Sequence, residues 1–366
     1  MHTKLRRVLG AAVLGTLTLS ALTACGGSQS SGDGGGEGGK DKTVTLVAHD
    51  SFAASEAVLE EFTEKTGYKV KVLRGGDAGS SLNQAILSKD NPQGDVLFGV
   101  DNTLLSRALD NDLFTPYEAE GLAKIPARYQ LDAEEHRVTP VDSGDVCVNY
   151  DRAYFDERGI APPKTLDDLA EPAYKGLLVT ENAATSSPGL GFLLATVAEY
   201  GEGWPQYWEK LKANDVEVVD GWEQAYYDRF SGSSGGKGKG DRPLVVSYAS
   251  SPPAEVLGAD PAPEQAPTGV ATGTCFRQIE FAGLLEGADN PEGGKALLDF
   301  MTGRSFQEDL PLQMFVNPVR EDAELPEVFT RYGETIDEPR TMAPEKIAEN
   351  REAWVKAWTS AVVRSS

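Results

Sequence analysis

"HRVTPVDSGDVCVNYD", residues 136–151, is a long stretch with the pattern of an extended β-strand. A second stretch of this kind, "GTCFRQIEFAGLLEG", spans residues 273–287. The two stretches bracket one region of alternating strands and helices and follow another, so they are expected to cross between two lobes. We therefore predict an α/β protein whose lobes are joined by two crossing strands.

The region before residue 136 alternates strands and helices. "TVTLVAHD" (43–50), "YKVKVLRGG" (68–76) and "GDVLFGVD" (94–101) are predicted strands, and helical apolar spacing follows each of them. A serine cap is expected for the helix in "SSLNQAILSK" (80–89). This order predicts a parallel sheet, in which ligands bind beyond the carboxyl ends of the strands. Asp50 and Asp101, at two such ends, are therefore candidate pocket residues.

The first 42 residues have the features of an export signal and a tether. Residues 1–24 combine a basic start with an apolar stretch too short to span a membrane, and Cys25 follows the small residues of "LTAC". This pattern predicts cleavage before Cys25 and lipidation of its thiol, and the Gly/Ser-rich residues 26–42 are predicted to be a flexible tether. The Arg6–Arg7 pair leaves the Sec and Tat export routes both open. We expect a protein held on the outer face of the cytoplasmic membrane by its lipid alone.

Composition excludes several functions. The 366-residue chain has a formal net charge of −23, which repels nucleic acid phosphates, so no nucleic-acid partner is expected. Outside the signal the histidines are His49 and His136, so a histidine–cysteine metal cluster is not expected. The sequence has no dinucleotide-binding or phosphate-binding glycine loop, and we predict neither a cofactor nor catalysis.

Two stretches present groups suited to a small ligand. In "TSSPGLG" (185–191), Ser186 and Ser187 precede an apolar helical pattern and suit a polar or anionic group, although a helix cap alone is the alternative. Trp222 follows a predicted strand and a glycine, and an aromatic face beside carboxylates suits a flat or cationic molecule. For Tyr226 and Tyr227, core packing is the alternative.

Several motifs together resemble those of the periplasmic thiamine-binding proteins of ABC importers. The resemblance covers most of residues 43–360, and its motifs are "HDSFAA" (49–54), "GVDNTLL" (99–105), "TSSPGLGFLL" (185–194), "DGWEQAY" (220–226) and "VVSYASSP" (245–252). It implies a two-lobed periplasmic-binding-protein fold, type II-like, that closes over thiamine or its phosphates without catalysis. The implied partner is the permease of an ABC importer, and we expect the protein to be a monomer.

The resemblance also implies ligand contacts at particular positions. These are Asp77, Ala78, Ser186, Ser187, Trp222, Tyr248, Ala249, Ser250 and Ser251, with Tyr226 and Phe315 as further pocket residues. The chain departs from the family in three places. Ala78 stands where glycine is usual, "SEAVLEEF" (55–62) lacks an expected tryptophan, and "QMFVNPV" (313–319) has Phe315 as its only aromatic residue.

The lobes and the cysteines complete the prediction. Residues 43–141 and 276–325 are assigned to the first lobe, and residues 142–275 and 326–366 to the second, which includes a C-terminal helix.

Cys147 and Cys275 lie one in each crossing strand. An exported protein permits a disulfide between them, and two isolated buried thiols are the alternative.

Two other functions compete with thiamine binding. A ferric iron-binding protein of an ABC importer could use Tyr226, Tyr227 and His49 as ligands. A protein of another class, an extracytoplasmic serine hydrolase, could use Ser186 or Ser187 as its nucleophile.

Overall fold

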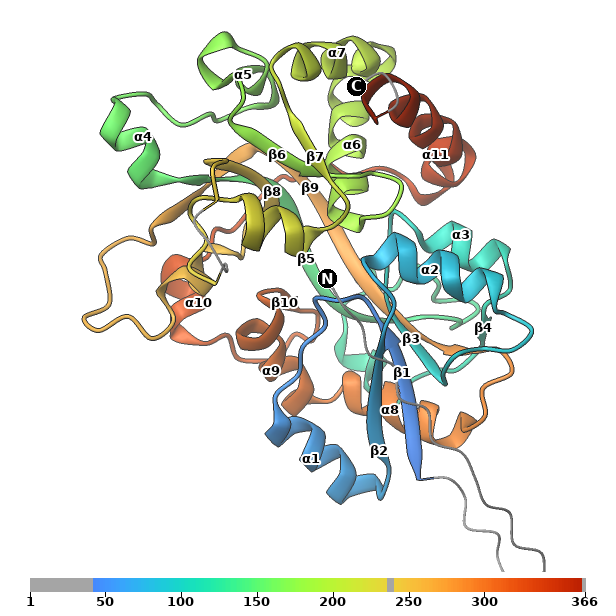
Figure 1. The fold of residues 1–366 in the computed structure, drawn as a ribbon. Coiled ribbons are helices and arrows are strands. Elements are labelled where there is room, and N and C mark those ends of the chain that lie inside the picture. The colour runs from blue at the N-terminus through green and yellow to red at the C-terminus, as the bar shows by residue number, and fades with distance from the viewer. Residues whose placement is uncertain (1–41, 236–239, 364–366) are drawn as a thin grey trace, which may run out of the picture. The chain divides into compact units, whose positions relative to one another are not determined.

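A computed structural model describes residues 42–235 and 240–363. Within these residues ten strands form one sheet in the order β2-β1-β3-β9-β5-β8-β6-β7, with β10 beside β5 and β4 beside β9 (Figure 1). The predicted signal peptide, Cys25 and nearly all of the tether lie outside the described residues. No helix in the described ranges has the length and apolar character needed to cross a membrane.

The first α/β region has the predicted alternation. Strands β1 (Thr43–Ala48), β2 (Lys69–Arg74) and β3 (Val96–Asp101) are parallel, because β1 pairs with both of the others. They alternate with helices α1 (Glu56–Thr66), α2 (Ala78–Leu87) and α3 (Leu105–Asp110). The expected serine cap of α2 is wrong, because the helix begins two residues earlier and the Asp77 carboxylate accepts the Ala78 N–H.

The second α/β region follows the same rule. Strand β6 (Leu178–Glu181) is parallel to β7 (Glu217–Val219) and to β8 (Leu244–Tyr248). Helices α6 (Ser187–Tyr200) and α7 (Trp204–Ala213) lie between β6 and β7 in the chain, after the shorter α4 (Arg152–Arg158) and α5 (Leu166–Leu169). Helix α6 is buried along most of its length, which explains its almost uniformly apolar sequence.

Strands β5 (Thr139–Asp151) and β9 (Thr268–Leu285) connect the two regions, so the predicted crossing strands are confirmed. They run antiparallel and side by side through the centre of the sheet (Figure 1). On one side of this strand pair β9 pairs with β3, and on the other side β5 pairs with β8. A disulfide joins Cys147 to Cys275 between these strands, with 4.2 Å between the Cα atoms.

The remaining elements follow β9 or precede β5. Their bounds are β4 (Phe114–Thr115), α8 (Pro291–Met301), α9 (Arg304–Met314), β10 (Asn317–Pro318), α10 (Glu327–Tyr332) and α11 (Pro344–Trp358). The C-terminal helix α11 packs against α7 through Trp358, whose ring lies 5.4 Å from that of Trp208. It also contacts α3, so it touches both α/β regions rather than the second alone.

Candidate ligand-binding site

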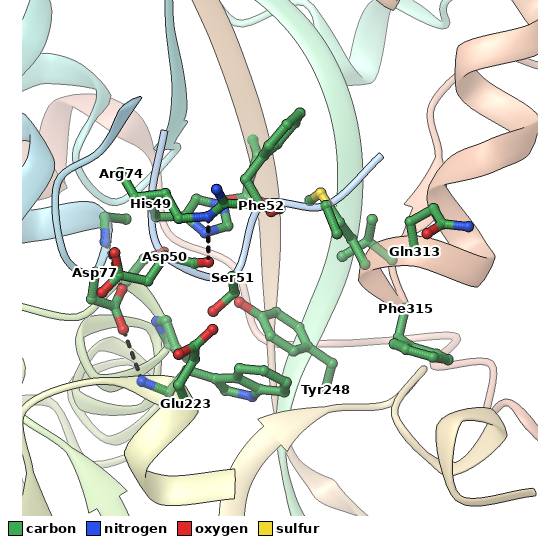
Figure 2. A pocket seen from close by; sticks show the side chains of 18 of the residues that line it. His49, Asp50, Ser51, Phe52, Arg74, Asp77, Glu223, Tyr248, Gln313 and Phe315 are labelled. Carbon is green, nitrogen blue, oxygen red and sulfur yellow. Dashed lines mark hydrogen bonds and ion pairs between the residues drawn. The ribbon is translucent and has the colours of Figure 1, made fainter. Parts of the chain in front are cut away.

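A cavity of about 530 Å³ lies where the carboxyl ends of the parallel strands meet β5 and β9 (Figure 2). Its lining residues are His49, Asp50, Ser51, Phe52, Ala53, Arg74, Asp77, Ala78, Ser187, Pro188, Trp222, Glu223, Tyr227, Tyr248, Glu280, Gln313, Met314, Phe315 and Val316. A neighbouring hollow of about 700 Å³ shares Asp50, Asp77, Trp222, Glu223 and Tyr227 with it. The two spaces therefore form one cleft.

The structure brings together seven of the residues that the sequence proposes for the pocket. Those that line the cavity are Asp50, Asp77, Ala78, Ser187, Trp222, Tyr248 and Phe315. The other six lie behind this surface and do not line it, and they are Asp101, Ser186, Tyr226, Ala249, Ser250 and Ser251.

Aromatic rings form one wall of the cavity. The Trp222 ring stacks on Tyr226 at 4.9 Å, and its Nε1–H donates to the Ser247 hydroxyl at 2.9 Å. Tyr226 itself is buried, and its hydroxyl donates to Glu255. Tyr226 thus packs in the core, which was the alternative for this residue, and supports the Trp222 ring. Gly144 lies under Tyr248, where a side chain would meet the ring at 2.9 Å.

The hydroxyls of the "TSSPGLG" stretch have partners within the protein. Ser186 is the N-cap of α6, and its hydroxyl accepts the Gly189 N–H at 3.5 Å. The Ser187 hydroxyl donates to Asp101 and accepts from the Gln278 amide. Of this stretch, Ser187 and Pro188 line the cavity, and Ser186 both caps α6 and hydrogen-bonds to Asp77.

The segment after Tyr248 supports the cavity from behind. The Ser250 hydroxyl donates to the Phe315 carbonyl at 2.6 Å, and the Ser251 hydroxyl shares a hydrogen bond with Ser247. Phe315 has a φ of 56°, in the left-handed region, at the end of α9. The Ala249 N–H donates to the Asp145 carbonyl. These contacts hold Tyr248 and Phe315 in place.

Asp77 joins the two α/β regions at the cavity edge. Its Oδ2 accepts the Trp222 N–H at 2.9 Å, and nearby the Ser80 N–H donates to the Thr185 carbonyl at 3.1 Å. A side chain on Gly79 would lie 2.7 Å from that carbonyl, so only glycine permits this approach. Burial raises the pKa of Asp77, while the Trp222 and Ala78 N–H groups lower it.

Three acidic side chains form a row that the sequence predicted only in part. Glu280 lies opposite Asp101 on β3 and opposite Asp142 on β5, and all three are buried. Glu280 lines the cavity. Asp101 was proposed from its place at a strand end, but Asp142 and Glu280 were missed. Their signal was an acidic residue in the middle of each buried crossing strand, which is costly unless it is paired or functional.

His49 and Arg74 are the basic residues that line the cavity (Figure 2). The His49 Nε2 lies 3.6 Å from Glu280, a separation that would favour an ion pair. Burial nevertheless lowers the pKa of His49 to about 4, with Arg74 adding to the effect, so the imidazole is neutral at neutral pH. The Arg74 guanidinium donates to the carbonyls of Asp50 and Phe52. The charged side chains of the cleft are thus mainly acidic.

The geometry bears on the two competing functions. Burial raises the pKa of Tyr226 well above its ordinary value, which opposes the phenolate that ferric iron prefers. For a hydrolase, Ser187 would need a base, but its hydroxyl donates directly to the Asp101 carboxylate and accepts from Gln278. Of the proposed iron ligands, His49 and Tyr227 line the cavity and Tyr226 does not, and within the described residues no cluster of His, Cys, Asp and Glu is suited to a metal ion.

Residues 91–333 match the bacterial extracellular solute-binding protein family, and the chain belongs to it. Membership makes it an extracytoplasmic solute-binding protein with a two-lobed fold. Within the family it is similar to the thiamine-binding periplasmic proteins of Salmonella typhimurium and Escherichia coli, at 31% and 30% identity, with 88% of this chain and 94% of each relative covered. It is also similar to the solved structure of a periplasmic thiamin binding protein, with a TM-score of 0.74, 29% identity and coverage of 87% of this chain and 96% of that one.

Proposed function

We propose that this protein captures thiamine in the cleft and delivers it to the permease of an ABC importer. The observation that carries the proposal is an aromatic wall around Trp222 in a cavity whose charged residues are mainly acidic. Thiamine has flat rings and one permanent positive charge, so it can stack on the wall and be attracted by the ring faces and carboxylates. The names of the similar proteins support the same ligand.

Free thiamine is proposed as the preferred form. The cleft is lined by the acids Asp50, Asp77, Asp220, Glu223, Asp228 and Glu280, and of the residues that the structure describes Arg74 is the permanent cation that lines it. A phosphate ester would bring negative charge toward these carboxylates. We expect free thiamine to bind roughly tenfold or more tightly than thiamine monophosphate. Binding constants for both ligands test this, and tighter binding of the phosphate would contradict it.

The ligand sites carried over from the resemblance divide into two groups. We propose that Asp77, Ala78, Ser187, Trp222 and Tyr248 contact thiamine, with Asp50 and Phe315 at the margin. Ser186, Tyr226, Ala249, Ser250 and Ser251 are proposed to hold these residues in position, because hydrogen bonds or ring contacts link them to the lining or to the backbone behind it.

Calorimetric titration of ligand-stripped protein with thiamine tests the main proposal. Trp222→Ala is expected to weaken binding by about 1–3 kcal/mol, the size of a lost desolvated aromatic or cation–π contact. Trp354→Ala is the matched control, because Trp354 lies on α11 and does not line the cleft. Absence of thiamine binding in the unaltered protein, or equal losses in both variants, would reject the proposed site.

The anchor is proposed from the sequence alone, and the lobes from the sequence together with the pairing of β5. We propose that Cys25 is lipidated and that residues 26–42 tether a monomeric body to the membrane. Cys25→Ser should abolish incorporation of a labelled lipid.

The proposed lobes are residues 43–141 with 276–325, and residues 142–275 with 326–366. Along β5, the partner changes from β10 at Asp142 and Ser143 to β8 from Val146 onward, which supports a boundary there.

A further inference from the structure

Three carboxyl groups lie in one row at the cavity. The register of the sheet places Asp101, Glu280 and Asp142 directly opposite one another across β3, β9 and β5. Their exposed fractions are 0%, 5% and 1%. Residues directly opposite in antiparallel strands point to the same face, and like charges in such positions destabilise the sheet. The row therefore needs protons or a cation to neutralise it.

The contact between Asp142 and Glu280 requires a proton. The two carboxyl groups hydrogen-bond to one another. An ionised carboxylate only accepts hydrogen bonds, so one of the two must carry the proton that the other accepts. Among the described residues no hydrogen-bond donor reaches the buried Asp142 Oδ2. Burial raises the pKa of Asp142 to about 7 and that of Glu280 well above its ordinary value.

The groups facing this pair do not replace the proton. Asp101 on β3 and Asp77 before α2 are acidic, and Tyr248 on β8 is neutral because burial raises its pKa. His49, after β1, is neutral because its pKa is lowered to about 4. Arg74, at the end of β2, lines the cavity but donates its hydrogen bonds to two backbone carbonyls.

We propose that the Asp142–Glu280 pair holds one shared proton when the cavity has no cation and releases that proton to solvent when a cationic ligand binds. The inference rests on the proposed function, because thiamine supplies the positive charge. The O–H bond of the pair breaks, the proton passes to buffer, and both carboxylates become ionised. The ligand's permanent charge compensates the carboxylate charge that is newly formed.

A consequence is that pH controls affinity. Because binding releases a proton, thiamine binds more tightly as pH rises, by at most roughly tenfold per pH unit for one proton. Because burial raises the pKa of Asp142 to about 7, the affinity at pH 8 is expected to be roughly tenfold higher than at pH 6. The neutral thiophene analogue 3-deazathiamine, which keeps the aminopyrimidine but lacks the charge, should bind without this dependence.

Calorimetry in buffers with different ionisation enthalpies tests the proposal. The unaltered protein should release about one proton per thiamine at pH 6.5, and none with 3-deazathiamine. Asp142→Asn and Glu280→Gln should abolish the release. Asp145→Asn is the matched control on β5: Asp145 lies opposite Arg277 and outside the cavity lining, so release should persist.

The outcomes separate this inference from the proposed function. Thiamine binding without proton release, or release that persists unchanged in folded Asp142→Asn and Glu280→Gln, would overturn the inference and leave thiamine capture standing. Absence of thiamine binding would overturn both. If the variants do not fold, the proton count of the unaltered protein and the neutral analogue decide the question by themselves.

Discussion

Two cross-strand pairs on β5 and β9 lie a few residues apart and differ in charge. Asp145 lies opposite Arg277, and its Oδ1 is 2.6 Å from the arginine Nε. Asp142 lies opposite Glu280, and both carboxyl groups are buried. The first pair follows the rule that opposite charges stabilise facing strands, and the second breaks it.

On these two strands, one charged pair lies away from the cavity and the other lies at it. Arg277 neutralises Asp145 away from the cavity lining, whereas Glu280 lines the cavity and has an acid beside it. Proteins keep unfavourable local arrangements mainly where a ligand or a reaction needs them. We therefore propose that the acid–acid pair marks the place at which the ligand's positive charge is bound, whereas the Asp145–Arg277 ion pair links the two strands.

The largest expected effect comes from a third link between these strands, the Cys147–Cys275 disulfide. The bond closes a loop with a sequence separation of 128 residues. Replacing both cysteines by serine is expected to lower the free energy of unfolding by about 2–5 kcal/mol, as measured by denaturant unfolding. Thiol titration of the unfolded, unreduced protein should find neither cysteine free. Two free thiols would contradict the bond and leave the charged pairs as the main links.

Removal of Arg277 should have a smaller effect of the same sign. Arg277→Gln leaves the largely buried Asp145 carboxylate without its counter-charge, so the free energy of unfolding should fall by about 1–3 kcal/mol. Arg304→Gln, at an exposed ion pair with Glu308, is the control and should leave the free energy of unfolding nearly unchanged, because solvent screens exposed ion pairs. Equal losses in the two variants would mean that the Asp145–Arg277 pair behaves as an ordinary surface pair.

An effect of opposite sign is expected at Asp142. Burial raises its pKa to about 7 in the folded protein, above the ordinary value of 3.8. Between about pH 4 and pH 7 the folded state therefore keeps a proton that the unfolded chain has lost. As the pH rises through this range, the free energy of unfolding falls by up to about 1.4 kcal/mol per pH unit.

Asp142→Asn should reduce this slope, so the variant should be more stable than the unaltered protein at pH 8 and differ less from it at pH 5. Denaturant unfolding of both proteins at pH 8 and pH 5 measures the difference in their free energies of unfolding. Glu157→Gln on α4 is the control, because its side chain is 76% exposed. A variant destabilised by the same amount at both pH values would show that Asp142 contributes packing rather than a protonation cost.

Much of the fold could be predicted from the sequence. The strand–helix alternation from Thr43 onward and the two long strands around Cys147 and Cys275 have strong local patterns. The helix cap at Asp77 was missed because Ser80, three positions on, is an equally good cap by composition. The C-terminal helix contacts both α/β regions, which its amphipathic pattern cannot indicate because the pattern shows only that one face is buried.

The candidate site was predictable in part. Trp222, Tyr248 and Asp77 follow strands or begin a helix, and such positions converge at one edge of a parallel sheet. Ser186 and Ser187 look alike in the sequence, but one caps a helix and the other hydrogen-bonds to Asp101. That distinction depends on which groups lie across the cleft.

The sequence by itself determined the class of fold, the aromatic and acidic character of the pocket and the family. These features follow from local periodicity, residue type and order, which do not depend on long-range register. Only the tertiary structure placed Asp142 against Glu280 and Asp145 against Arg277. The physical reason is that strand register is a long-range property. A one-residue shift of β5 against β9 would turn Asp142 and Asp145 to the opposite face of the sheet and leave all four residues with different partners.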